Sequence, residues 1–152
     1  MQLNVRGFYT DPNYSIDIDF KVFKFIKRKL EEIIFAKYNL NNIHPDTFLI
    51  ITETTGKDSL EELSVTGPFY RNKQKYITYN IWLPYYPITK SENEREAFVY
   101  HYFEGLKRVF SHYGVKEEDI EEVRKIVEKE VVNNPHYDYS HQVVPRPPKD
   151  IE

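Results

Sequence analysis

The five histidines of this 152-residue chain are its first candidates for chemistry, because imidazole binds metal ions and transfers protons near neutral pH. Three polar residues, His101, Glu104 and His112, fall on one face of a predicted helix. His112 lies about three turns beyond His101, roughly 16 Å along the helix axis at 1.5 Å per residue, so the two cannot bind one ion. We expect no metal site and interpret this face as a solvent-facing polar surface.

Further acid–base groups lie in residues 136–141, which read His-Tyr-Asp-Tyr-Ser-His. The spacing of the two histidines does not match that of metal ligands on a helix. Acid–base catalysis needs positioned, desolvated groups with shifted pKa values, and a proline-flanked tail supplies neither. Tyrosine suits contact surfaces, because it brings area at a low cost in conformational entropy. Tyr137 and Tyr139 are therefore candidates for partner binding.

The sequence contains no catalytic signature. It has no P-loop, Rossmann glycine set, nucleophile elbow or zincin motif. The absence of cysteine excludes disulfides, thiolate metal ligands and a cysteine nucleophile. Its five glycines are scattered, so no loop can cradle a phosphate in the usual way. We expect no cofactor, although a carboxylate pair for glycoside hydrolysis stays open, because such pairs are distant in sequence.

Charge is distributed unevenly along the chain. Residues 19–37 carry six Lys or Arg against three acids, and residues 116–130 carry seven acids against four bases. The acids near the start of the second segment are Glu117, Glu118, Asp119, Glu121 and Glu122. They could steer a basic partner protein, or the two segments could be ordinary solvated faces that pair with each other. Contact of the basic segment with RNA is a further alternative, but the net charge of −3 argues against a general nucleic-acid binder.

Hydrophobic periodicity predicts the elements that position these residues. Strands are expected at residues 2–9, 47–52, 60–70 and 75–83, and helices at residues 17–38, 92–113 and 117–132. The order β-α-β-β-β-α-α, with strands bunched in the middle, indicates an α+β fold in which an antiparallel sheet of three or four strands packs against helices. We expect residues 1–132 to form a single domain and residues 133–152 to form a proline-rich, extended tail.

The strand at residues 75–83 points to a possible contact surface. Ile77, Tyr79 and Ile81 share one face, whereas Tyr76 and Trp82 lie on the other. Few helices are available to cover both faces, so the second face could be an exposed aromatic patch of the kind that marks interaction sites. Coverage by the tail is the alternative.

Composition and the N-terminal residues restrict the class of the protein and its cellular localisation. No apolar run approaches the roughly 20 residues of a transmembrane helix, and the first residues do not resemble a signal peptide. Ile, Lys, Asn and Tyr are plentiful, a bias typical of an AT-rich genome. We therefore expect a cytoplasmic protein of a low-GC bacterium.

Several segments together carry a resemblance to a known class of proteins. They are MQLNVRGFY, KVFKFIKRKLEEII, TFLIIT, the hairpin closing on YITYNIWLPY, and the last two helices, within residues 1–132. This arrangement resembles the small α/β immunity proteins of bacterial polymorphic and contact-dependent toxin systems. The resemblance implies a non-enzymatic cytoplasmic protein that binds a cognate toxin, often a basic nuclease, through an acidic or aromatic surface and occludes its active site. Alternatives are a small enzyme or ligand-binding domain, and a specialised chaperone or assembly factor.

Overall fold

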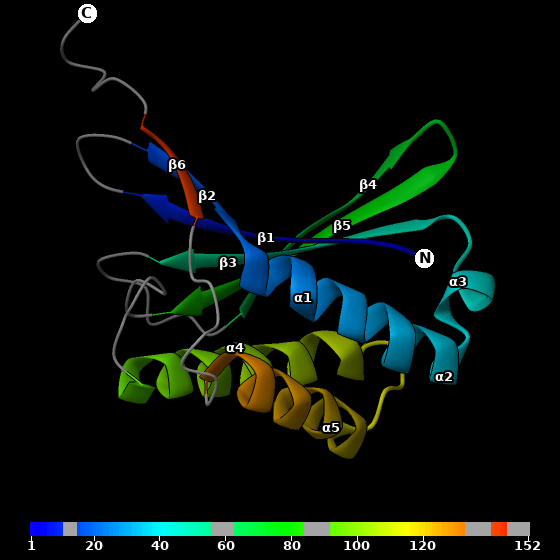
Figure 1. Ribbon diagram of the computed structural model, residues 1–152. Coiled ribbons are helices and arrows are strands. Elements are labelled where there is room, and N and C mark those ends of the chain that lie inside the picture. The colour runs from blue at the N-terminus through cyan, green and yellow to red at the C-terminus, as the bar shows by residue number, and fades with distance from the viewer. Residues whose placement is uncertain (11–14, 56–62, 84–91, 133–140, 146–152) are drawn as a thin grey trace, which may run out of the picture.

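A single sheet covered on one side by helices forms the molecule, as Figure 1 shows for the computed structural model. The structure describes residues 1–10, 15–55, 63–83, 92–132 and 141–145. The strands are β1 (Gln2–Thr10), β2 (Ser15–Phe20), β3 (Thr47–Thr55), β4 (Leu63–Arg71), β5 (Gln74–Leu83) and β6 (His141–Pro145). The helical segments are α1 (Lys21–Lys29), α2 (Ala36–Tyr38), α3 (Leu40–Ile43), α4 (Glu92–Ser111) and α5 (Glu117–Val127), with π-helical segments η1 (Leu30–Phe35) and η2 (Glu128–Val132). The predicted α+β class is confirmed.

The sheet differs from the prediction in size and direction. It has six strands in the order β4-β5-β3-β1-β2-β6, and the pairs β1–β3 and β3–β5 are parallel. The expectation of an antiparallel sheet of three or four strands is therefore wrong. The helix that follows β2 carries the chain back across the sheet, so β3 enters beside β1 in the same direction. The hairpin of β4 and β5 then places β5, the second of its strands, against β3.

One of the additional strands comes from a segment predicted as the start of a helix. Ser15–Phe20 reads Ser-Ile-Asp-Ile-Asp-Phe, a strict alternation of polar and apolar residues. It forms β2, which pairs with β1 in an antiparallel hairpin, and the helix begins only at Lys21. The two-residue period of this segment is typical of a strand, and the three- and four-residue steps of a helix begin only after it.

The other additional strand comes from the predicted tail. Five residues, His141–Pro145, form β6 and pair with β2 at the edge of the sheet. Their backbone is extended, as predicted, but it belongs to the sheet. The division of the chain at residue 132 stays a prediction, because most of residues 133–152 lie outside the described ranges.

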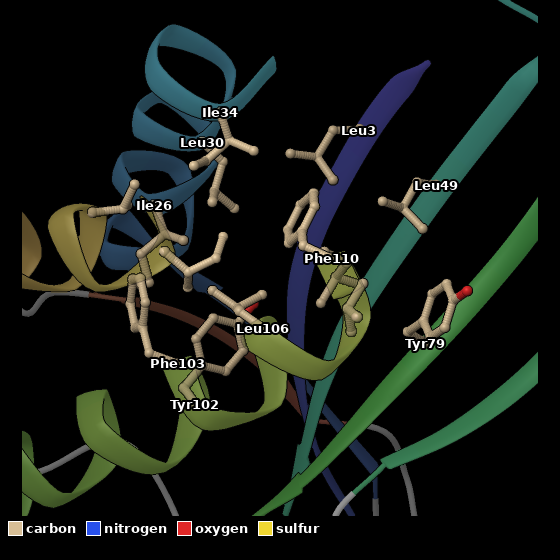
Figure 2. Close-up of a cluster of buried hydrophobic side chains, with 14 of the residues drawn as sticks. Leu3, Ile26, Leu30, Ile34, Leu49, Tyr79, Tyr102, Phe103, Leu106 and Phe110 are labelled. Carbon is tan, nitrogen blue, oxygen red and sulfur yellow. The ribbon is translucent and has the colours of Figure 1, made fainter. Parts of the chain in front are cut away.

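The core lies between the sheet and the helices, and Figure 2 shows side chains of both layers meeting there. The strands contribute alternate residues such as Leu49, Ile77 and Ile81, because successive side chains of a strand point to opposite faces. The helices contribute residues at three- and four-residue steps. Fully buried members on α1, η1 and α4 are Ile26, Leu30, Ile34, Tyr102, Phe103, Leu106 and Phe110. This packing covers one face of the sheet.

Helix α4 lies close to the sheet at a glycine, Gly105. A Cβ atom on Gly105 would lie 2.6 Å from Ile81 Cγ2, 2.8 Å from Ile81 Cγ1 and 2.9 Å from Ile81 Cδ1. Real Cβ atoms essentially never come this close to another atom. The missing side chain therefore lets α4 lie directly on β5.

Candidate interaction surface

The face of the sheet that points away from the helices is the candidate functional site, and we call it the open face. Strand register and the alternation of side chains identify its described residues on β4, β5, β3 and β1, which lie on the same side of the sheet as Tyr76. They are Gln2, Asn4, Phe48, Ile50, Thr52, Ser64, Thr66, Phe69, Arg71, Gln74, Tyr76, Thr78, Asn80 and Trp82. In Figure 1, the labelled helices α1, α4 and α5 all lie on the other side of the sheet. The same register carries this face on to β2, where it includes Asp17 and Asp19.

Three rings form a row across the open face, and we call Phe69, Tyr76 and Phe48 the aromatic row. Phe69 pairs with Tyr76, and Tyr76 pairs with Phe48, in the register of neighbouring strands. The ring centroids of Phe48 and Tyr76 lie 5.4 Å apart. Tyr76 Oη donates a hydrogen bond of 3.0 Å to Gln74 Oε1. Phe69 is 61% exposed, so the row ends in a ring that lies largely in solvent.

The far end of the same face is held by hydrogen bonds between side chains. Trp82 Nε1 donates to Ser64 Oγ at 3.0 Å, and Thr52 Oγ1 donates to Asn80 Oδ1. Both pairs join neighbouring strands and satisfy polar groups that are at least partly buried. These hydrogen bonds hold the side chains of this end in place, and Thr52 is only 3% exposed.

Sequence reasoning found two of the open-face residues and missed others. Tyr76 and Trp82 lie on the face opposite Ile77, as their alternation predicts. Phe69 was missed because the strand register shifts between Thr66 and Phe69, which breaks the alternation that assigns residues to a face. The available signal was its position opposite Tyr76 in the predicted hairpin.

The predicted acidic surface on α5 is smaller in the structure, because Asp119 is buried. Asp119 is 2% exposed and joins α5 to α2. Its Oδ1 accepts a 2.6 Å hydrogen bond from Lys37 Nζ, and its Oδ2 accepts one from Tyr38 Oη. These bonds, Lys37 first, hold the pKa of the Asp119 carboxyl below its usual value. Its role is thus to fasten two helical segments.

Glu121 is also occupied within the chain. Its carboxylate lies 2.6 Å from Arg124 Nη2 and 2.5 Å from Lys107 Nζ, which links α5 to α4. The hydrogen bond from Arg124 is the main cause of a lowered pKa for Glu121. Of the five predicted acids, Glu117, Glu118 and Glu122 remain exposed. An acidic docking surface on α5 therefore has fewer available carboxylates than the sequence indicated.

The histidines do not converge. His101 and His112 are both exposed on α4 and the turn that follows it, and the ring of His112 stacks on Tyr79 with centroids 5.5 Å apart. Within the described ranges, no group of three or more His, Asp or Glu side chains is arranged to hold a metal ion. Tyr137 and Tyr139 lie outside those ranges, so their predicted role in partner binding stays a prediction.

A pocket of about 300 Å³ opens between α4 and α5. It is lined by Glu96, Ala97, Tyr100, His101, Arg124 and Glu128. The guanidinium of Arg124 already pairs with Glu121 and, at 2.5 Å, with Glu128. The one lining cation is thus neutralised by neighbours, which leaves little charge for a small anionic ligand.

Each helix in the described part of the chain is too short or too polar to cross a membrane. Comparison of the chain with protein-family models, with curated proteins and with solved structures found no match.

Proposed function

We propose that this chain is a non-enzymatic, cytoplasmic protein that binds a partner protein across its open face. The observation that carries the proposal is the aromatic row of Phe69, Tyr76 and Phe48 on a sheet face that no described helix covers. The cores of protein interfaces are enriched in aromatic residues and Arg and depleted of acids. On β3, β4 and β5 the open face matches this pattern, with three rings, Trp82 and Arg71 and without a carboxylate, whereas Asp17 and Asp19 belong to the same face at β2.

We further propose that the partner is a bacterial toxin domain, which the chain neutralises as an immunity protein. A preorganised sheet face suits this task, since inhibition by occlusion needs a broad contact held in one geometry. The burial of Asp119 and the ion pairs of Glu121 favour the open face over α5 as the main contact.

The first test is to sequence the DNA that flanks this gene in its source genome. An immunity gene must accompany its toxin gene, because a cell that loses the antidote is killed. We expect a neighbouring reading frame for a large secreted protein that ends in a short domain. That domain, co-expressed with this chain, should form a complex with it and become harmless to the host.

Point variants then locate the contact. Phe69→Ala and Tyr76→Ala, alone and combined, should abolish both the complex and the protection of growth. The matched control is Tyr100→Ala, which removes an aromatic ring that is 49% exposed on the helical side. Thermal melting checks that each variant folds. Protection that survives loss of both open-face rings, or a gene neighbourhood of metabolic enzymes with no complex, would refute the proposal.

A further inference from the structure

The turn between β4 and β5 carries a concentration of positive charge without internal partners. Arg71 and Lys73 are exposed and Lys75 is half-buried. Within the described residues, none of the three forms an ion pair, whereas Lys37, Lys107 and other helical cations do. In Figure 1, this turn projects away from the helices. Arg71 lies on the open face and Lys73 in the turn beside it, whereas Lys75 lies on the helix-side face. A chain with a net charge of −3 thus presents two exposed cations, Arg71 and Lys73, at this end of the open face.

The backbone of this turn makes Lys73 notable. Asn72 and Lys73 have φ values of 52° and 64°, which form the two-residue hairpin turn whose twist matches that of the strands. Glycine is the residue that adopts such a conformation without a steric penalty, and asparagine tolerates it. A lysine with a positive φ has a steric cost that glycine avoids. Among the described residues, the Lys73 side chain has no partner that would offset this cost. A strained residue of this kind is a reason to look for a role outside the chain.

The surroundings of the turn do not neutralise it. The described open face beside it bears amides, hydroxyls and rings, and Arg71 lies two residues from Phe69 on the same face. Asp46 comes directly before β3, and its backbone oxygen accepts a 2.7 Å hydrogen bond from Lys75 N. Among the described residues, its carboxylate forms no ion pair with Arg71, Lys73 or Lys75. A complementary partner must therefore offer negative charge opposite the turn and apolar area opposite the aromatic row.

We infer that the open face binds an acidic segment of a partner polypeptide, with carboxylates over the β4–β5 turn and apolar side chains over the aromatic row. This inference rests on the proposed function and adds the chemistry of the partner. A polypeptide fits better than a single-stranded nucleic acid, which needs a cationic groove along its whole backbone. The partner segment lies across the open face and does not pair with the edge strand β4, because Pro68 and the register shift interrupt that edge.

A random copolymer of glutamate and tyrosine serves as the probe, and the fluorescence of Trp82 reports binding. Trp82 is the only tryptophan in the chain, and it lies on the open face. We expect a saturable change in its emission that weakens as salt is added. Arg71→Glu combined with Lys73→Glu should weaken binding about tenfold or more, because like charges would then face each other. The matched control is Lys125→Glu with Lys129→Glu, the same change of charge at exposed positions on α5 and η2.

Lys73→Gly provides a second variant that does not risk unfolding, since glycine relaxes the turn. It should weaken copolymer binding while the protein melts at the same or a higher temperature. An unchanged Trp82 emission, an equal loss in the α5 control, or tighter binding of oligothymidylate with the same dependence on Arg71 and Lys73 would each overturn the inference. If Phe69→Ala and Tyr76→Ala still abolish toxin protection in that case, the proposed function stands and only the acidic partner chemistry is wrong.

Discussion

Replacing Gly105 with alanine tests the close contact between α4 and β5. The new Cβ would meet three carbons of one side chain, Ile81, at 2.6–2.9 Å. Ile81 is 1% exposed, so its side chain cannot turn outward into solvent. Either Ile81 must leave its rotamer or α4 must move away from β5, and both disturb a close-packed core.

Two opposing effects set the magnitude. Alanine is favoured over glycine inside a helix by up to about 1 kcal/mol. An added methyl group in a packed core destabilises by about 1–3 kcal/mol. Three contacts shorter than 3.0 Å place Gly105→Ala toward the upper end of that range. We therefore expect a net loss of about 1–2 kcal/mol, which for a chain of this size lowers the melting temperature by about 2–8 °C.

Urea denaturation followed by circular dichroism measures this loss, and a double-mutant cycle assigns its cause. Ile81→Ala removes all three clashing carbons and leaves a cavity. In that background Gly105→Ala should be neutral or stabilising, because its methyl group fills the space and the helix propensity improves. A Gly105→Ala protein as stable as the wild type, or the same loss in both backgrounds, would show that the close approach of α4 and β5 does not limit stability.

Three further predictions concern the turn and the titratable groups. Lys73→Gly should raise the free energy of unfolding by about 0.5–1 kcal/mol in urea melts, and a lower value would contradict the argument from its positive φ. The depressed pKa of Asp119 contributes stability that is complete above its ordinary value of 3.8 and is lost as the pH falls through the lowered one. Melting temperatures measured below pH 3.8 should therefore fall less steeply with decreasing pH for Asp119→Asn than for the wild type. Burial raises the pKa of Tyr113 above its ordinary 10.0, so the stability from its neutral phenol is lost as the pH rises past that value. Tyr113→Phe should melt with less dependence on pH than the wild type between about pH 9 and 11.

Local periodicity predicted the elements that depend on local pattern. The segment at residues 75–83 forms β5, and the stripe along residues 117–132 forms α5 and η2. The direction of β3 was not predictable in this way, because a run of apolar residues reads the same in a parallel and in an antiparallel pair. Strand β2 was missed because its alternation was short and ran directly into the helical stripe of α1.

The same distinction between local pattern and distant contacts applies to the predicted site residues. Alternation alone placed Tyr76 and Trp82 on the face away from the core. The separate fates of Glu118 and Asp119, adjacent acids of which one is exposed and one is buried, depend on Lys37 and Tyr38, which come from a distant helix. Such a contact leaves no local signal, so the sequence could not distinguish a fastening carboxylate from an available one.

The pairing of β6 with β2 has a consequence for solubility. At one edge of the sheet, β4 resists pairing with other chains through Pro68 and its irregular register. At the other edge, β2 has neither device, and β6 occupies its outer backbone groups. Without residues 141–145, β2 would present a regular row of free amides and carbonyls, which is a template for aggregation. The edge is instead formed by β6, which is only five residues long and ends at Pro145. A short strand with a proline is a poorer template for pairing with another chain than β2 would be.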